Sequence, residues 1–128
     1  MTVQYDLKNL SENGKHGFHI HTYGDLSDGC ASMGGHFNPY GMKHGGRDSL
    51  IRHLGDFGNV ESDADGISTG SFKEWVSTLY GVNSIIGRGC MIHGGEDDLG
   101  LKGDAGSIGF GNSGSRMGCG VVAFRKLE

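Results

Sequence analysis

Six of the seven histidines of the chain lie in one short stretch, from His16 to His53, and an aspartate, Asp56, follows directly. Neutral imidazole is the commonest protein ligand for copper and zinc, and a carboxylate can complete a zinc site. So many imidazoles in one segment predict a transition-metal site. The seventh histidine, His93, lies further along the chain.

The sharpest element of this stretch is His19-Ile20-His21. Side chains alternate along a β-strand, so a strand here would direct both imidazoles into the same space. A pair of exposed strand histidines is the alternative, and the His-x-His spacing alone does not exclude it. His93 ends a short apolar run that begins at Cys90 and predicts a strand, so it is the candidate for a further donor beside the pair.

Four more donors follow on a loop. His36, His44, His53 and Asp56 are separated by glycine-rich segments. Four nitrogen and oxygen donors on one folded loop suit a closed tetrahedral zinc site. Together with the histidine pair, they favour metal binding over a chance cluster.

Short strands, turns and long loops must position these residues. Glycine supplies 26 of the 128 residues and proline one, and glycine destabilises a helix interior by roughly 1 kcal/mol per residue. We therefore expect an all-β fold, in one domain over residues 1–128. Alternation and turn signals predict a turn at 63–66 and strands at 3–10, around 57–61, and at 67–72, 75–80, 89–93 and 120–124.

Charge and hydropathy narrow the function classes. The formal net charge is −4 and there is no basic cluster, which disfavours nucleic acid or an anionic membrane as a partner. No apolar run approaches the length of a membrane span, and the first residues lack the charged-then-apolar pattern of a secretion signal. We therefore expect a cytoplasmic protein.

Seven motifs together resemble the copper/zinc superoxide dismutases. In chain order they are Gly17-Phe18-His19-Ile20-His21, Gly35-His36-Phe37-Asn38-Pro39, Lys43-His44-Gly45-Gly46, Arg52-His53-Leu54-Gly55-Asp56, Ile85-Ile86-Gly87-Arg88, Asp97-Asp98-Leu99-Gly100 and Gly114-Ser115-Arg116-Met117-Gly118-Cys119-Gly120. The likeness implies a Greek-key β-barrel or sandwich with two long loops, a metal loop and an electrostatic loop.

The resemblance also implies a ligand set for two metals that share one imidazole. Copper would be bound by His19, His21, His36 and His93, and zinc by His36, His44, His53 and Asp56. Asp97 would hydrogen-bond His19 and His44 from outside the two sites. Taken without the resemblance, Asp97 is more simply a solvated loop carboxylate.

The implied activity is the conversion of two superoxide anions and protons to dioxygen and hydrogen peroxide, by alternate reduction and reoxidation of copper. Arg116 would position the anionic substrate by charge-assisted hydrogen bonding, and His36 would hand on a proton. A non-catalytic copper/zinc-binding protein with a truncated barrel is the alternative, and such a protein would be expected to lose Arg116 or the open copper face.

Three further expectations come from the family pattern. A disulfide would join Cys30 to Cys119, which leaves Cys90 as a small buried residue. Members of the family usually begin with two more strands before the one at Val3, so the barrel would lack its first two strands. The first of these lies at the usual dimer interface, so we expect a homodimer to be weakened, although the segment 85–88 keeps part of that surface.

Overall fold

The computed structural model describes residues 1–128 as an almost entirely β structure. The strands are β1 (Thr2–Leu7), β2 (Lys15–His21), β3 (Ser27–Cys30), β4 (Asp56–Glu61), β5 (Ser68–Lys73), β6 (Gly89–His93) and β7 (Arg116–Val121). The helical elements are one 3-10 turn, η1 (Ala31–Met33), and one short α-helix, α1 (Ala105–Phe110). None of its helices has the length and apolar character needed to span a membrane. The prediction of an all-β fold is confirmed.

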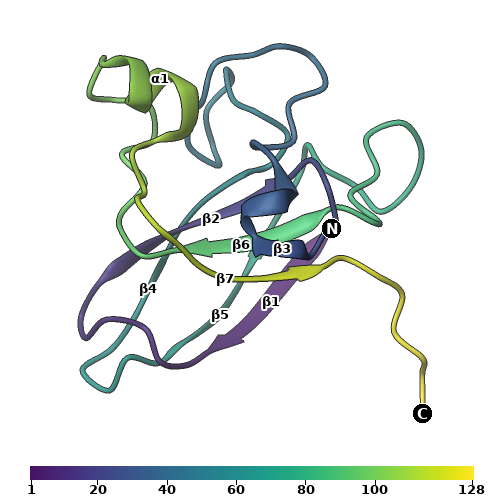
Figure 1. Ribbon diagram of the computed structural model, residues 1–128, viewed down its shortest axis with the longest axis horizontal. Helices are drawn as coiled ribbons and strands as arrows, with labels where there is room; N and C mark the ends of the chain where they lie inside the picture. The colour runs from purple at the N-terminus through teal and green to yellow at the C-terminus, as the bar shows by residue number, and fades with distance from the viewer.

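The strands form two antiparallel sheets (Figure 1). One sheet pairs β1 with β5, and the other has the order β4-β2-β6-β7. The barrel is not closed, because β1 pairs only with β5 and β7 pairs only with β6. Between them lies an apolar groove of about 660 Å³, lined by Leu7–Leu10, Cys90, Ile92 and Met117–Ala123. We refer to this feature as the open groove.

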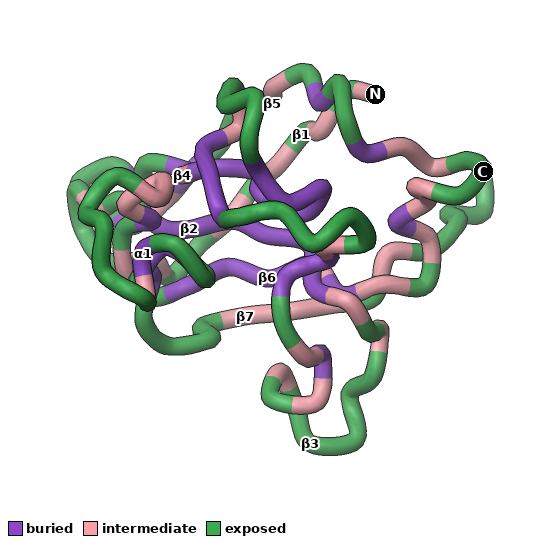
Figure 2. Tube along the Cα trace, turned by 90° about the horizontal axis from the view of Figure 1, so that it is seen from above, coloured by how far each residue is buried: buried purple, intermediate pink, exposed green.

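The core lies between the two sheets, where alternate side chains of the strands meet. Phe18 and Ile20 of β2 are buried there, and Phe18 packs edge-to-face on Phe57 of β4, with ring centroids 5.4 Å apart. Phe72 of β5 adds a third ring, 5.6 Å from Phe57. Buried residues accordingly concentrate in β2, β4 and β6, whereas β3 has none (Figure 2). Because Phe18 and Ile20 point into this core, alternation directs His19 and His21 to the opposite face of β2.

Three of the six strands predicted by range lie within one residue of the observed ones. The segments 57–61, 67–72 and 89–93 correspond to β4, β5 and β6, and the turn at 63–66 separates β4 from β5. The first strand ends at Leu7, before Asn9 adopts a positive φ of 63°. The last strand runs over 116–121 rather than 120–124, and β3, η1 and α1 were not predicted.

The strand predicted at 75–80 is wrong. The segment is irregular, with a single isolated bridge between Thr78 and Ser84. The carboxylate of Glu74 accepts the backbone N–H groups of Val76 (2.7 Å) and Ser77 (2.9 Å), which folds the chain into a local turn. Trp75 is 79% exposed and so contributes no buried face to a sheet. The side chain of Glu74 therefore binds backbone N–H groups that a strand would have paired with a neighbour, and the strand suggested by the apolar alternation does not form.

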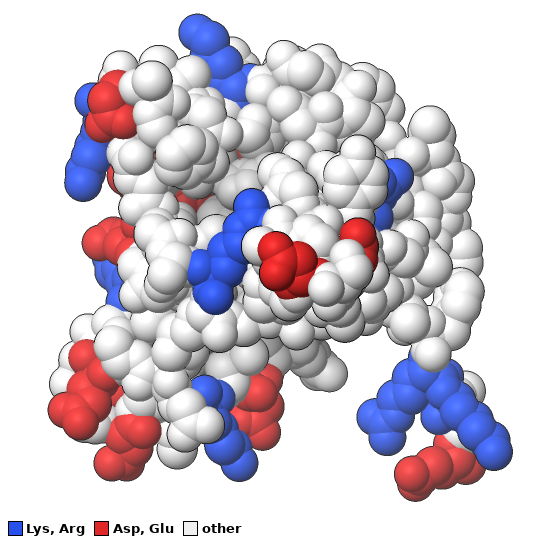
Figure 3. Space-filling view, viewed as in Figure 1, with Lys and Arg blue, Asp and Glu red and all other residues white.

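Charged side chains of both signs are interspersed on the face shown in Figure 3. Beyond β7 the chain leaves the body of the molecule as an exposed tail, which carries Arg125, Lys126 and Glu128.

Candidate metal centre

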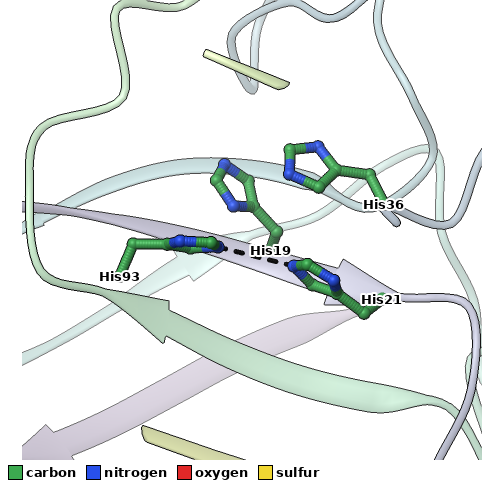
Figure 4. A group of neighbouring side chains, drawn as sticks. All are labelled: His19, His21, His36 and His93. Carbon is green, nitrogen blue, oxygen red and sulfur yellow. Dashed lines mark hydrogen bonds between the residues drawn. The ribbon is translucent and has the colours of Figure 1, made fainter. Parts of the chain in front are cut away.

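Two strands and one loop bring four imidazoles together (Figure 4). His19 and His21 lie on β2, His93 ends β6, and His36 comes from the loop after η1. The ring centroid of His19 is 3.9 Å from that of His36 and 4.9 Å from that of His93. The register of β6 with β7 shifts between Ile92 and His93, and an irregularity of this kind re-aims a side chain at the end of a strand.

One ring nitrogen of each strand histidine is fixed by a partner outside the cluster. Nδ1 of His21 donates to the carbonyl of Gly34 (2.8 Å), and Nδ1 of His93 donates to the carbonyl of Gly114 (3.2 Å). This leaves the two Nε2 atoms facing each other at 3.4 Å. Outer hydrogen bonds of this kind fix the tautomer and direct the free nitrogen of a metal-binding histidine.

A second group of donors surrounds the carboxylate of Asp56. Its Oδ1 lies 2.9 Å from Nδ1 of His36, 3.0 Å from Nδ1 of His44 and 3.2 Å from Nδ1 of His53. The Nδ1 atoms of His36 and His53 are 3.3 Å apart. Zinc binds such donors at about 2.0–2.2 Å, so the corners of its tetrahedron are about 3.3–3.5 Å apart. These four distances are therefore close to the corner spacing of a tetrahedral zinc site.

Asp97 joins the two groups. Its Oδ2 accepts a hydrogen bond from Nε2 of His19, and its Oδ1 accepts one from Nε2 of His44, both at 2.7 Å. Asp97 is 1% exposed, and its backbone N–H donates to the side chain of Asn59. One buried carboxylate therefore orients one imidazole of each group.

The donor set fits bound cations. Three buried side-chain polar atoms make no hydrogen bond, and two of them are Nδ1 of His19 and Nδ1 of His44, the latter 3.0 Å from Oδ1 of Asp56 but without hydrogen-bond geometry. Both point away from Asp97, which holds the other nitrogen of each ring. A buried polar atom without a partner is costly, and coordination to a metal ion satisfies it.

Electrostatics favour neutral imidazoles and ionised carboxylates. Burial lowers the pKa of His19 and of His21 to about 3, and it also lowers the pKa of His36 and of His93. Neutral imidazole is the form that binds metals. Burial would raise the pKa of Asp56, but hydrogen bonds from the surrounding histidines outweigh it and hold that pKa well below its usual range.

Asp97 shows the same balance as Asp56, whereas His44 is the exception among the imidazoles. Burial would raise the pKa of Asp97, but its hydrogen bonds with His19 and His44 lower the pKa to about 2. Burial would lower the pKa of His44, yet its two carboxylate neighbours raise the pKa to about 9. Two negative charges thus lie inside the centre, where bound cations would compensate them.

Arg116 lies at the start of β7, where its exposed side chain is held by backbone carbonyls. Its guanidinium donates to the carbonyls of Cys30 (2.8 Å), Ala31 (3.4 Å) and Gly34 (2.6 Å). The Gly34 carbonyl also fixes His21, so the arginine and the imidazole share a support. A disulfide between Cys30 and Cys119 ties the same loop to β7.

His16 is buried but belongs to neither group of donors. Its Nδ1 donates to the backbone carbonyl of His93 (2.8 Å), and its Nε2 lies 2.9 Å from the hydroxyl of Ser11. Sequence reasoning missed the carbonyls of Gly34 and Gly114, because every residue has a carbonyl and no residue type marks these two.

Comparisons with known proteins point to one family. A family model described as copper/zinc superoxide dismutase matches residues 1–122. Among the relatives, a protein of Yarrowia lipolytica named superoxide dismutase [Cu-Zn] is 49% identical over 122 residues, covering 95% of this chain and 79% of its own. Proteins of the same name from Schizosaccharomyces pombe (50% over 122 residues, 95% and 79%) and Saccharomyces cerevisiae (48% over 121 residues, 94% and 79%) are similar.

Proposed function

The chain belongs to the copper/zinc superoxide dismutase family, and we propose that His36 is the ligand shared by its two metals and that Arg116 positions the substrate. The protein is an oxidoreductase that converts superoxide to dioxygen and hydrogen peroxide, with copper and zinc as cofactors. Copper, when bound, supplies the one-electron chemistry by alternate reduction and reoxidation. The protein's own residues bind the metals, orient the substrate and hold the proton.

The copper ligands proposed are His19, His21, His36 and His93, whose donor atoms lie within 4.8 Å of one another. The zinc ligands proposed are His36, His44, His53 and Asp56. By distance alone, His19 also groups with His36, His44 and Asp56. However, Nε2 of His19 is engaged by Asp97, which leaves only Nδ1 to bind a metal. One free nitrogen serves one metal, so we assign His19 to copper and His53, beside Asp56, to zinc.

The position of His36 between the two groups of donors supports its role as the shared ligand. Its Nδ1 lies among the Asp56 group, and its ring stacks on His19 of the copper group. The second ring nitrogen of His36 can hold a proton and pass it to the reduced substrate. Burial lowers the pKa of His36, which favours release of that proton.

The free N–H groups of the Arg116 guanidinium support its role in positioning the substrate. An arginine has five N–H donors, and three hydrogen bonds to backbone carbonyls leave two of them. The three carbonyls fix the plane of the group, while the free donors can form charge-assisted hydrogen bonds with an anion. The side chain is thus oriented before superoxide arrives.

The single observation that carries these assignments is the convergence of buried imidazoles whose outer nitrogens are already held. We test them with metal analysis and a superoxide-removal assay on wild type, His36→Ala and Arg116→Ala, with Arg125→Ala in the exposed tail as the matched control. Arg116→Ala should keep its metals and lower kcat/KM about tenfold or more, since a hydrogen bond to a charged group contributes about 1.5–3 kcal/mol. His36→Ala should lose activity together with part of its metal.

Two results would contradict these assignments. Arg116→Ala at the wild-type rate would remove Arg116 from substrate positioning. Fully metallated wild-type protein that clears superoxide no faster than buffer would instead favour the non-catalytic metal-binding alternative.

A homodimer is a further proposal. Tyr23 is 60% exposed and Val121 is 43% exposed, and both lie beside the Gly24–Gly87 contact. A Cβ at Gly24 would be 2.3 Å from the Gly87 carbonyl oxygen and 2.9 Å from Cγ1 of Val121, so these residues form one surface. Sedimentation velocity should show a concentration-dependent dimer that Val121→Glu abolishes, and a wild type that stays monomeric at high concentration would rule it out.

Two broader features also stay proposals. We expect residues 1–128 to form one domain, which the family match over residues 1–122 supports, and a single calorimetric transition of the protein would check this. We expect a cytoplasmic location, which microscopy of a fluorescent fusion would check.

A further inference from the structure

We propose that Arg52 and Glu74 are positioning residues that fix the backbone of His53 and so direct its ring in the metal centre. The inference rests on the proposed role of His53 as a zinc ligand. Arg52 is 4% exposed and Glu74 is fully buried, and they form an ion pair with Nη2 3.2 Å from Oε2. Neither side chain lies among the metal donors, so each acts through the main chain.

The guanidinium of Arg52 uses all of its donors. Two N–H groups donate to Oε2 of Glu74, at 3.3 and 3.2 Å. The other three donate to backbone carbonyls of the metal loop: Nε to His53 (3.0 Å), Nη1 to Arg47 (2.6 Å) and Nη2 to Leu54 (3.0 Å). Five donors thus make five hydrogen bonds, which is the full capacity of the side chain.

The carboxylate of Glu74 is equally saturated. Oε2 accepts the two bonds from Arg52, and Oε1 accepts the backbone N–H groups of Val76 and Ser77. The hydroxyl of Ser77 in turn donates to the Leu54 carbonyl. The turn after β5 and the metal loop are therefore joined through one buried network with every partner present, and such networks hold a single arrangement.

His53 is the residue that this network can direct. Its own N–H donates to Oδ2 of Asp56 (2.8 Å), and its carbonyl accepts Nε of Arg52 (3.0 Å). Both ends of the residue are thus fixed: the N–H by Oδ2 of Asp56, and the carbonyl by Arg52 together with the backbone N–H of Asp56 (3.2 Å). The region from 34 to 55 contains no helix or sheet strand that could do this instead. Precise metal sites depend on supporting residues of this kind.

The test uses metal affinity rather than stability alone. The full chain is stripped of metal, and zinc affinity is measured by competition with a chelator at a temperature where circular dichroism shows every variant folded. Cobalt(II) in the zinc position then reports ligand geometry through its visible absorption. The variants are Arg52→Lys, which keeps the charge and loses the planar fork, and Glu74→Gln, which keeps the shape and loses the charge.

Arg88→Lys is the matched control. Arg88 also donates from a partly buried guanidinium to backbone carbonyls, those of Ser84 and Thr22; in the metal loop it contacts the ring of Phe37 but donates to no carbonyl. We expect Arg52→Lys and Glu74→Gln to weaken zinc binding about 10- to 100-fold and to alter the cobalt spectrum. Arg88→Lys should do neither.

A double variant controls for loss of stability, because removing only one partner leaves an unpaired buried charge that can itself destabilise the fold. Arg52→Met with Glu74→Leu removes both charges and should show the same loss of zinc affinity. Wild-type affinity and an unchanged spectrum in these variants, with only a lower Tm, would overturn the proposal and leave a purely structural pair.

His53→Ala separates this failure from failure of the ligand assignment. If His53→Ala loses zinc affinity while the Arg52 and Glu74 variants do not, only the positioning proposal is wrong. If His53→Ala binds zinc as tightly as wild type, the assignment of His53 is wrong and the positioning proposal falls with it.

Discussion

The metal centre and the open groove differ in which interactions fix their backbone. In the metal centre, loops without regular structure are fixed by side chains, and carboxylates such as Asp56 and Asp97 bind several partners each. Along the open groove the backbone is regular, yet β1 and β7 each lack a neighbour on one side, and apolar side chains such as Met117 (46% exposed) face solvent. Along the open groove, regular strands thus leave a sheet edge and apolar side chains uncovered, whereas in the metal centre carboxylates hold the irregular loops in place.

Metal removal should have the largest effect on this contrast. Metals bind the folded form and add their binding free energy to its stability, which for structural zinc is on the order of 10 kcal/mol. Without the metals, the buried carboxylate charges of the centre are not neutralised and its free imidazole nitrogens have no partner. Calorimetry should show a much lower Tm after chelation, and hydrogen exchange should show protection lost in β4 and β6 before the β1–β5 pair. Equal loss in both places would mean that the two regions unfold as one.

The disulfide should have the next largest effect, because it connects the two regions. Cys30 ends β3 and its carbonyl accepts a hydrogen bond from Arg116, and Cys119 lines the open groove. The bond spans a sequence separation of 89 residues, and closing a loop of that size restricts the unfolded chain by about 4–5 kcal/mol. Urea titration of Cys119→Ser should therefore show about this loss of unfolding free energy. Cys90→Ala removes a thiol but no cross-link, so a comparable loss in that control would argue against the cross-link as the cause.

Truncation of a core ring should cost slightly less and should separate the two regions directly. Phe57 is 1% exposed between Phe18 and Phe72, so Phe57→Ala should lower the unfolding free energy by about 3–5 kcal/mol. Met117→Ala in the open groove should lower it by less than about 1 kcal/mol, because that side chain is already half exposed. Similar losses in chemical denaturation would show that the groove is packed in solution.

Most donors of the metal centre could be predicted from the sequence, because their signals are local. The alternation of His19 and His21 on a strand needs only the period of two, and the loop histidines are close in sequence. Strands β4, β5 and β6 were also found from local signals, either an alternation or a short apolar run beside turn residues.

What could not be predicted depends on long-range partners. Glu74 folds the next residues into a turn and pairs with Arg52, and nothing in the local pattern of 75–80 reports either contact. Helix α1 was missed because two of its six residues are glycine, and it begins where Asp104 caps the N–H of Ser107. Side-chain capping determined the structure in both places, against the propensity of the segment.

Ser113 lies beside the metal centre and has a buried hydroxyl without a partner. Its removal should give the smallest change in unfolding free energy, and this change should be a gain rather than a loss. Ser113 is 1% exposed, and its Oγ is the third buried polar atom without a partner. Unlike Nδ1 of His19 and of His44, this hydroxyl is no donor of either metal group. It lies against the backbone of β2, where a Cβ on Gly17 would be 2.4 Å from it.

Ser113→Ala removes the unpaired hydroxyl and keeps the Cβ that packs there. A buried donor without a partner costs about 1–3 kcal/mol, so the variant should gain about 1 kcal/mol of unfolding free energy at full metal content, with the superoxide rate unchanged. Ser113→Thr keeps the hydroxyl and adds a methyl group in a filled space, so it should be less stable than wild type. If Ser113→Ala is instead destabilised in the same urea titration, the hydroxyl has a bound water as its partner, and the metal centre has no unsatisfied group once its metals are in place.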